Sequence, residues 1–217
     1  ADHRAGIPIV TEANMQELHF DRPAHVSENF EQIQADLLKA AELLPLVTAY
    51  KGDDLGRANK DAAFAYLVKT NLQWARYDQS KWAEVVKYCD MVTNSGSGRA
   101  LIDTDNPAED FASVFYIQNN YSSEYIFSVV SNRTRGSILP AVMFENTGYG
   151  MYNGWGYFHP TLELYNSFEK GDARLKATIL EFGDTYTLFG EERKYNSSNS
   201  QTGFQFNKYM HPFRTPA

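Results

Sequence analysis

The sequence predicts a mainly α-helical protein, in which helical hairpins are followed by a loop-rich, aromatic-rich region with short strands. Apolar residues recur at helical spacing through most of residues 25–95. Phe, Tyr and Trp number only 9 in residues 1–108 but 22 in residues 109–217. A β-branched and aromatic run at 125–130 is typical of a short strand. We therefore expect the first half of the chain to be regular and helical, and the second half to be looser and richer in aromatic residues.

The first helix is expected from about residue 27 to residue 44. Before it, Gly6, Pro8 and Pro23 favour an extended entry. Ser27 is suited to the N-cap position, because its hydroxyl can accept a hydrogen bond from a free backbone N–H. Leu44-Pro45 marks the end. The apolar positions share one face, namely Phe30, Ile33, Leu37, Ala40, Ala41 and Leu44.

A helical hairpin is expected over residues 59–93. Its first helix runs from about Asn59 to Ala75. Its second helix follows a turn at residues 78–80 and ends at the Ser- and Gly-rich residues 94–98. The spacing of Trp82, Val85, Cys89 and Val92 resembles the second half of a tetratricopeptide unit. We expect Trp74, Trp82 and Cys89 in the hairpin core. A solenoid needs at least three such repeats, so the chain looks like part of something larger.

The second half is less regular. Residues 125–130 (Tyr-Ile-Phe-Ser-Val-Val) are expected as a short buried strand. Residues 148–156 alternate glycine with aromatic side chains, a loop composition. Residues 160–168 regain helical spacing, with Pro160 and Thr161 at an acceptable helix start. Residues 190–203 are polar and rich in Asn, Ser and Gly, so we expect a surface loop.

Composition excludes several classes of protein. The net charge is −7, from 20 Lys and Arg against 27 Asp and Glu, which argues against a nucleic-acid binder. No apolar run approaches the ~18 residues of a transmembrane helix. Cys89 alone excludes an intrachain disulfide, and no two of the five histidines have the i, i+4 spacing of a helical metal site. We expect no metal and no cofactor.

Catalysis finds little support in the sequence. There is no Gly-x-Ser-x-Gly elbow and no phosphate-binding glycine motif. A glycoside hydrolase needs only two carboxylates at a suitable separation, and Glu163, Glu169 and Asp172 are candidates. Nothing in the sequence marks two of them as a pair. We therefore expect a protein that is not an enzyme.

The aromatic loop is the best candidate site. Sugar rings present apolar C–H faces that stack on aromatic rings, while their hydroxyls need polar partners. The loop supplies both kinds of group, and Tyr and Trp suit a half-exposed binding surface. The alternative is that these rings anchor the loop to a core. The candidate ligand-binding residues are Tyr149, Tyr152, Asn153, Trp155 and Tyr157.

Several segments together resemble the SusD/RagB family of outer-membrane nutrient-binding lipoproteins. Each motif is weak singly, but their order and spacing extend over most of the chain. The matching segments are residues 6–12, residues 33–37 through Pro45, residues 56–94, residues 123–129, and Trp155-Gly156 with Pro160-Thr161 through Arg174.

The resemblance implies a helical scaffold of tetratricopeptide-like hairpins, at about 25–95, and a loop-rich ligand-binding region packed against it, at about 107–217. It implies non-catalytic capture of oligosaccharides, or in some members of peptides, at the bacterial surface. The ligand passes to a SusC-like TonB-dependent transporter barrel. Members belong to polysaccharide-utilisation systems and are held at the outer membrane by a lipidated N-terminal cysteine.

The sequence departs from the family pattern at both ends. The lipidation cysteine and early helices are missing before Ala1, and the carboxyl-terminal helices after Tyr209 are missing too. We therefore interpret residues 1–217 as an internal part of a single SusD-like domain. The resemblance carries over only Trp155 as a ligand residue; Tyr149, Tyr152, Asn153 and Tyr157 come from loop chemistry. Two alternatives remain open: the same fold capturing peptides and, less favoured, a glycoside hydrolase. Arg174 is expected in a structural ion pair or a helix-end contact, and not as a ligand residue.

Overall fold

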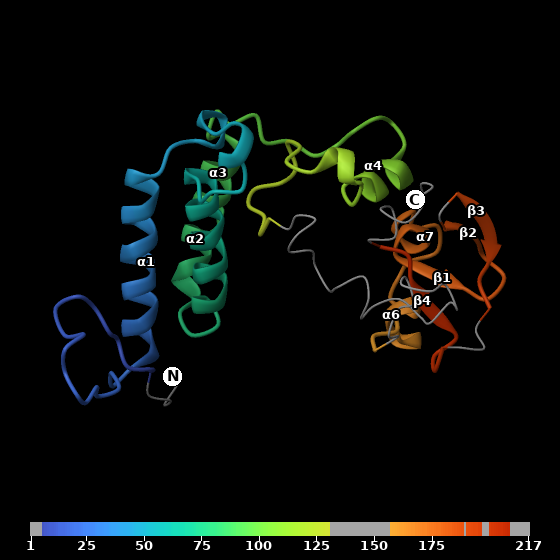
Figure 1. Cartoon of the computed structure of the whole chain (residues 1–217). Helices are drawn as coiled ribbons and strands as arrows, with labels where there is room; N and C mark the ends of the chain where they lie inside the picture. Colours follow the sequence, from blue (N-terminus) through green and yellow to red (C-terminus); the bar gives the residue numbers. More distant parts are fainter. Residues whose placement is uncertain (1–5, 131–156, 189, 197–199, 209–217) are drawn as a thin grey trace. The chain divides into compact units, whose positions relative to one another are not determined.

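The structure is a computed structural model that describes residues 6–130, 157–188, 190–196 and 200–208 (Figure 1). The chain divides into two compact units. Unit 1 contains residues 1–100 and 125–129, and unit 2 contains residues 101–124 and 130–217. The mainly helical fold class is confirmed, with strands of three or four residues. No helix among the described residues is long and apolar enough to span a membrane.

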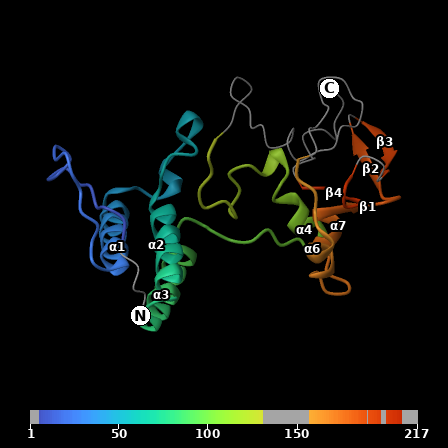
Figure 2. The same cartoon turned by 90° about the horizontal axis from the view of Figure 1, so that it is seen from below.

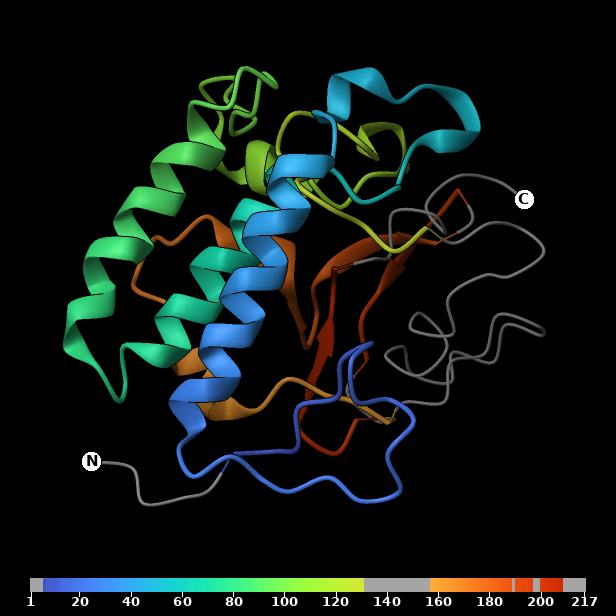
Figure 3. The ribbon, with the colours of Figure 1, turned by 90° about the vertical axis from the view of Figure 1, so that its left-hand side faces the viewer.

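Unit 1 is built on three helices, α1 (Val26–Leu43), α2 (Lys60–Trp74) and α3 (Trp82–Thr93). Short 3-10 turns lie at Val47–Ala49, Gly52–Asp54 and Gln79–Lys81. The central helix α2 packs against both α1 and α3. The three helices run in alternating directions (Figure 3). The predicted hairpin over residues 59–93 is thus confirmed.

The core of unit 1 centres on α2. Ala62 and Ala63 are buried, and their small side chains allow neighbouring helices to approach closely. Leu67 is fully buried, and the buried Trp74 ring stacks on Phe30 of α1, with ring centroids 5.5 Å apart. The predicted core position of Trp74 is therefore confirmed.

Two other core predictions for the hairpin are wrong. The Trp82 side chain is 48% exposed, and Cys89 is exposed. Tyr88 and Val92 are buried instead. The reason is geometric: α2 covers the face of α3 that carries Tyr88 and Val92, and leaves the neighbouring apolar face uncovered.

The start of α1 also differs from the prediction. The helix begins at Val26, so His25, not Ser27, is the N-cap. The backbone N–H of His25 donates to Glu28 Oε1 at 3.1 Å. The preceding extended segment is tied to α1 by Asn29, which accepts from the N–H of Ile7 at 3.0 Å and donates to its carbonyl at 2.8 Å.

The predicted strand at 125–130 is not a strand in the structure. Phe127 and Val129 are exposed, and no strand hydrogen bonding involves this segment among the described residues. Its carbonyls bind side chains instead: Arg99 Nη1 donates to Tyr125, and the Asn59 amide donates to Ile126 at 3.2 Å. The segment is therefore held to unit 1 by two side chains.

Unit 2 combines short helices and short antiparallel strands. The helices are α4 (Pro107–Ser113), α6 (Leu162–Asn166) and α7 (Arg174–Thr178), with a 3-10 turn at Ile117–Asn119. The strands are β1 (Ile179–Glu181), β2 (Thr185–Leu188), β3 (Glu191–Lys194) and β4 (Phe204–Phe206). β1 pairs with β4, and β2 pairs with β3 (Figure 1 and, from below, Figure 2). α7 packs on α4 and leads directly into β1.

The expectation of a surface loop over residues 190–203 is wrong for its first part. Glu191–Lys194 form β3, and Thr185 opposes Lys194 in the hairpin with β2. The β3 residues are mostly exposed, which is why their composition is that of a loop. Backbone pairing with β2, and not burial, makes this segment a strand.

The buried part of unit 2 lies along the β1–β4 pair. Ile179, Leu180 and Gln205 are nearly inaccessible to solvent. At the end of β4, Lys208 Nζ lies 4.7 Å from the centroid of one α4 ring, Phe111, and 4.6 Å from that of Phe115. A cation over aromatic faces is attractive, so this contact ties the end of β4 to α4.

Candidate functional site

Only one of the five predicted ligand-binding residues lies in the described part of the chain. Tyr149, Tyr152, Asn153 and Trp155 lie outside the described residues. Tyr157 is described, at the start of an irregular stretch that leads into α6. The site can therefore be built from Tyr157 and the elements that hold it.

Tyr157 presents its ring to solvent. Its side chain is 70% exposed, and the next residue, Phe158, is also exposed. Two residues further on, Pro160 is fully buried, and Thr161 caps α6 by accepting a hydrogen bond from the N–H of Leu164 at 3.2 Å. The two exposed rings are thus followed at once by an anchored turn.

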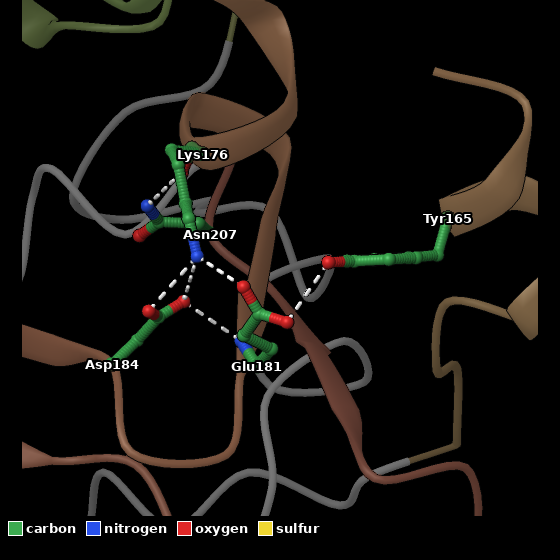
Figure 4. Close-up of polar contacts among 5 residues, drawn as sticks. All are labelled: Tyr165, Lys176, Glu181, Asp184 and Asn207. Carbon is green, nitrogen blue, oxygen red and sulfur yellow. Dashed lines mark hydrogen bonds and ion pairs between the residues drawn. The ribbon is translucent and has the colours of Figure 1, made fainter. Parts of the chain in front are cut away.

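α6 is itself fixed to the strands of unit 2 by Tyr165. The Tyr165 ring stacks on Phe204 of β4, with centroids 4.8 Å apart and planes 17° from parallel. Its hydroxyl donates to Glu181 Oε2 of β1 at 2.9 Å (Figure 4). One side chain therefore joins α6 to both strands of the β1–β4 pair.

A polar cluster continues from Glu181. Lys176 Nζ binds the other oxygen of Glu181 and lies 3.0 Å from Asp184 Oδ1 (Figure 4). Asp184 Oδ2 accepts from the backbone N–H of Glu181 at 2.9 Å, and the Asn207 amide donates to the Lys176 carbonyl at 2.7 Å. The cluster joins α7, β1 and the turn after β1, and with Tyr165 it makes α6 part of the same framework.

The pKa shifts agree with these contacts. Burial lowers the pKa of Lys176, but hydrogen bonds and the charges of Glu181 and Asp184 outweigh it, so the pKa is raised overall. The Lys176 ammonium, assisted by the Tyr165 hydroxyl, holds the pKa of Glu181 below its ordinary value. The hydrogen bond to Glu181 raises the pKa of Tyr165. At neutral pH, Lys176 is therefore charged, Glu181 is ionised and Tyr165 keeps its hydroxyl proton.

Two of the three carboxylates weighed as catalytic candidates, Asp172 and Glu163, have partners within their own segment. Arg174 Nε and Nη2 bind the two oxygens of Asp172 at 2.9 and 2.6 Å, which confirms the predicted ion pair and lowers the pKa of Asp172. Hydrogen bonds from the backbone N–H of Glu163 and from the Thr161 hydroxyl lower the pKa of Glu163. Within the described ranges, no three His, Cys, Asp or Glu side chains gather as a metal site.

The structure adds one ring that the sequence did not single out. Phe158 is exposed beside Tyr157. A phenylalanine is buried in most folds, so composition alone gives no reason to place it on the surface. Its position directly after Tyr157 is the one signal the sequence offered.

The fold is that of SusD-like proteins. This class has a helical scaffold with tetratricopeptide-like repeats, and the resemblance inferred from the motifs is confirmed at the level of the fold. No family model matches the chain, and no curated protein matches it.

Solved structures supply the particular likenesses. Surface glycan-binding protein A from Bacteroides uniformis is 22% identical, with a TM-score of 0.68 over 94% of this chain and 42% of its own. A SusD-like carbohydrate-binding protein from Bacteroides fragilis is 21% identical, with a TM-score of 0.69 over 94% of this chain and 44% of its own. Surface glycan-binding protein A from Bacteroides thetaiotaomicron, in complex with laminarihexaose, is 16% identical, with a TM-score of 0.58 over 87% and 43%. This chain thus spans less than half the length of these structures.

Proposed function

We propose that this protein binds oligosaccharides without cleaving them, at the outer surface of a bacterium, and delivers them to a SusC-like TonB-dependent transporter. The observation that carries the proposal is the fold. Nearly the whole chain superposes on surface glycan-binding proteins, one of them with an oligosaccharide bound.

The aromatic residues before α6 supply the chemistry for this ligand. An exposed ring that is held in place can stack on the apolar face of a sugar with little loss of side-chain entropy. Tyr157 is exposed, and the chain directly after it is anchored by the buried Pro160 and the cap of α6. We infer that Trp155, Tyr152, Tyr149 and Asn153 complete the same site.

The remaining parts of the proposal concern the domain organisation of the protein and its location in the cell. Residues 1–217 form part of one SusD-like domain, with a helical scaffold at about 25–95 and a ligand-binding region at about 107–217. The protein is held at the outer membrane by a lipid anchor outside this sequence. The likeness to surface glycan-binding proteins supports this placement.

The proposal is of a binding protein and not an enzyme. The likeness of the fold to surface glycan-binding and SusD-like carbohydrate-binding proteins supports this. Incubation with a polysaccharide panel is expected to release no reducing sugar. Sugar release that a single Glu or Asp substitution abolishes would replace binding by hydrolysis.

The binding test compares wild type with two sets of variants. Isothermal titration with laminarihexaose and a panel of other oligosaccharides is expected to find at least one ligand. The double variant Trp155→Ala/Tyr152→Ala is expected to bind that ligand at least about fivefold more weakly, since a well-placed stack contributes on the order of 1 kcal/mol beyond burial. Tyr157→Ala is expected to weaken it by a smaller factor.

Tyr77→Ala is the matched control, because Tyr77 is an exposed tyrosine of unit 1, far from this loop in the sequence. Its affinity should equal that of wild type. Unchanged affinity in the Trp155/Tyr152 variant would place the site elsewhere. Binding confined to a peptide library would refute the glycan ligand while keeping the fold.

A further inference from the structure

The short helix α6 depends on Tyr165 for its position in unit 2. The helix contains only five residues, Leu162–Asn166, and a helix of this length is not stable on its own. Its position must therefore come from contacts with other elements. Tyr165 supplies two of them, the ring stack on Phe204 of β4 and the hydroxyl bond to Glu181 of β1 (Figure 4).

The two partners of Tyr165 are themselves paired. Glu181 and Phe204 stand directly opposite each other in the register of β1 and β4. The tyrosine is therefore held through its ring and through its hydroxyl by a single residue pair of these strands. Because the acceptor is an ionised carboxylate, the hydroxyl bond is of the stronger, charge-assisted kind. Together the two contacts fix both the position and the tilt of α6.

The chain just before α6 is attached to the same strand. The Ser200 hydroxyl donates to the Phe204 carbonyl at 2.8 Å, and His159 Nδ1 lies 3.4 Å from that hydroxyl oxygen. Pro160, the next residue, is fully buried. Residues 159–165 are thus attached to Phe204 at both ends, through its carbonyl at one end and through its ring at the other.

We propose that Tyr165 is a positioning residue for the sugar-stacking ring of Tyr157, an inference that rests on the proposed function. Tyr157 lies two residues before His159, so the attachment of this segment to Phe204 limits where the exposed ring can go. A ring that is fixed before the ligand arrives binds more tightly, because less freedom is lost on binding. Tyr165 acts through the backbone, since its own ring and hydroxyl are engaged by Phe204 and Glu181.

The test is a double-mutant cycle of Tyr165→Phe and Tyr157→Ala, followed by isothermal titration with laminarihexaose and the oligosaccharide panel. Tyr165→Phe keeps the stack and removes only the hydroxyl bond. It is expected to weaken binding about threefold, within the range of one hydrogen bond and no more than Tyr157→Ala does. In the Tyr157→Ala background, the same change should weaken binding by less than about 1.5-fold. A merely structural role would lower the affinity equally in both backgrounds.

Tyr116→Phe is the matched control, because it also removes a tyrosine–glutamate hydrogen bond in unit 2, from the Tyr116 hydroxyl to Glu109 Oε2 at 3.3 Å. Its affinity should equal that of wild type. A second measurement needs no ligand. Hydrogen exchange over residues 157–164 is expected to be faster in Tyr165→Phe than in wild type or in Tyr116→Phe, because the segment opens more often without the hydroxyl bond.

Three results would overturn the inference. Wild-type affinity in Tyr165→Phe would show that the hydroxyl bond does not serve binding. An equal loss in both backgrounds would show that Tyr165 acts independently of Tyr157, and unchanged exchange over residues 157–164 would show that the bond does not hold this segment. If no oligosaccharide binds wild type, the proposed function fails and the inference fails with it. If wild type binds and Tyr165→Phe binds equally well, only the inference fails.

Discussion

The buried ion pair of unit 1 gives the sharpest stability prediction. Asp61 of α2 is fully buried, and its Oδ2 lies 3.1 Å from Nε of Arg99, whose side chain is only 8% exposed. The same guanidinium donates to the Tyr125 carbonyl. Replacing Arg99 by Met would leave a carboxylate without its cation and a carbonyl without its donor.

The size of the effect follows from burial. Two unit charges about 4 Å apart attract by about 4 kcal/mol at an effective dielectric constant of about 20. Breaking such a pair from one side typically costs about 3–5 kcal/mol, because the remaining charge stays desolvated. We expect Arg99→Met and Asp61→Leu each to lower the free energy of unfolding by that order. The double variant should lose much less than the sum, since it contains no unpaired charge.

The assay is urea unfolding, followed by the fluorescence of Trp74 and Trp82, which both lie in unit 1. A double-mutant cycle on Asp61 and Arg99 should give a coupling energy of about 3 kcal/mol. Lys39→Met is the matched control, because its ion pair with Glu42 is exposed and such pairs contribute about 0–1 kcal/mol.

The reasoning fails if the two single changes add to within about 0.5 kcal/mol, which is the behaviour of independent sites. It also fails if Arg99→Met is as mild as Lys39→Met. Either result would mean that the carboxylate of Asp61 is not confined as the structure has it.

Two further predictions concern the start of the chain and the cluster of unit 2. Gly6→Ala should loosen the first described segment, because a Cβ there would lie 2.0 Å from Asn29 Oδ1, and hydrogen exchange at Ile7 should become faster. Unchanged exchange would refute the close approach. In the cluster, the lowered pKa of Glu181 means stability that is present above the ordinary value of 4.5 and lost as pH falls through the folded value. In Lys176→Met, the melting temperature should therefore fall less steeply than in wild type as the pH is lowered below 4.5. An unaltered pH profile would contradict the role given to the ion pair.

The sequence predicted the three helices of unit 1 because their signals are local, but it did not predict α4 or α7. The periodicity of residues 60–74 and the N-cap at Asn59, whose Oδ1 accepts from the N–H of Ala62 at 3.0 Å, lie within a few residues of one another. The same reasoning misplaced Trp82 and Cys89. Periodicity shows that a face of a helix is apolar, but not which face a neighbouring element will cover.

The short strands were missed for a different reason. β3 is Glu-Glu-Arg-Lys, a sequence with no strand preference, and it is extended because β2 pairs with it. Thr185-Tyr186-Thr187 in β2 did carry a β-branched and aromatic signal that could have indicated the hairpin. The run at 125–130 carried a stronger signal and is not a strand, since side chains occupy its carbonyls.

The candidate site also has one part that local sequence signals could predict and one part that they could not. Loop chemistry selected Tyr157, and the structure places that ring in solvent. The cluster that fixes the neighbouring framework joins Lys176 to Asp184 and Asn207, the last from 31 residues away. No spacing rule connects such positions, so only the folded structure could bring them together.

The return of residues 125–129 to unit 1 affects how the protein can be dissected. The chain passes between the units at three points, near residues 100, 124 and 129, so one cut cannot separate them. A truncated protein ending at residue 100 would lose the two carbonyls that Arg99 and Asn59 bind. The buried ion pair between Asp61 and Arg99 would then lie next to the new end of the chain. A shortened protein in which residues 125–129 are linked directly after residue 100 would contain the whole of unit 1 and keep these bonds.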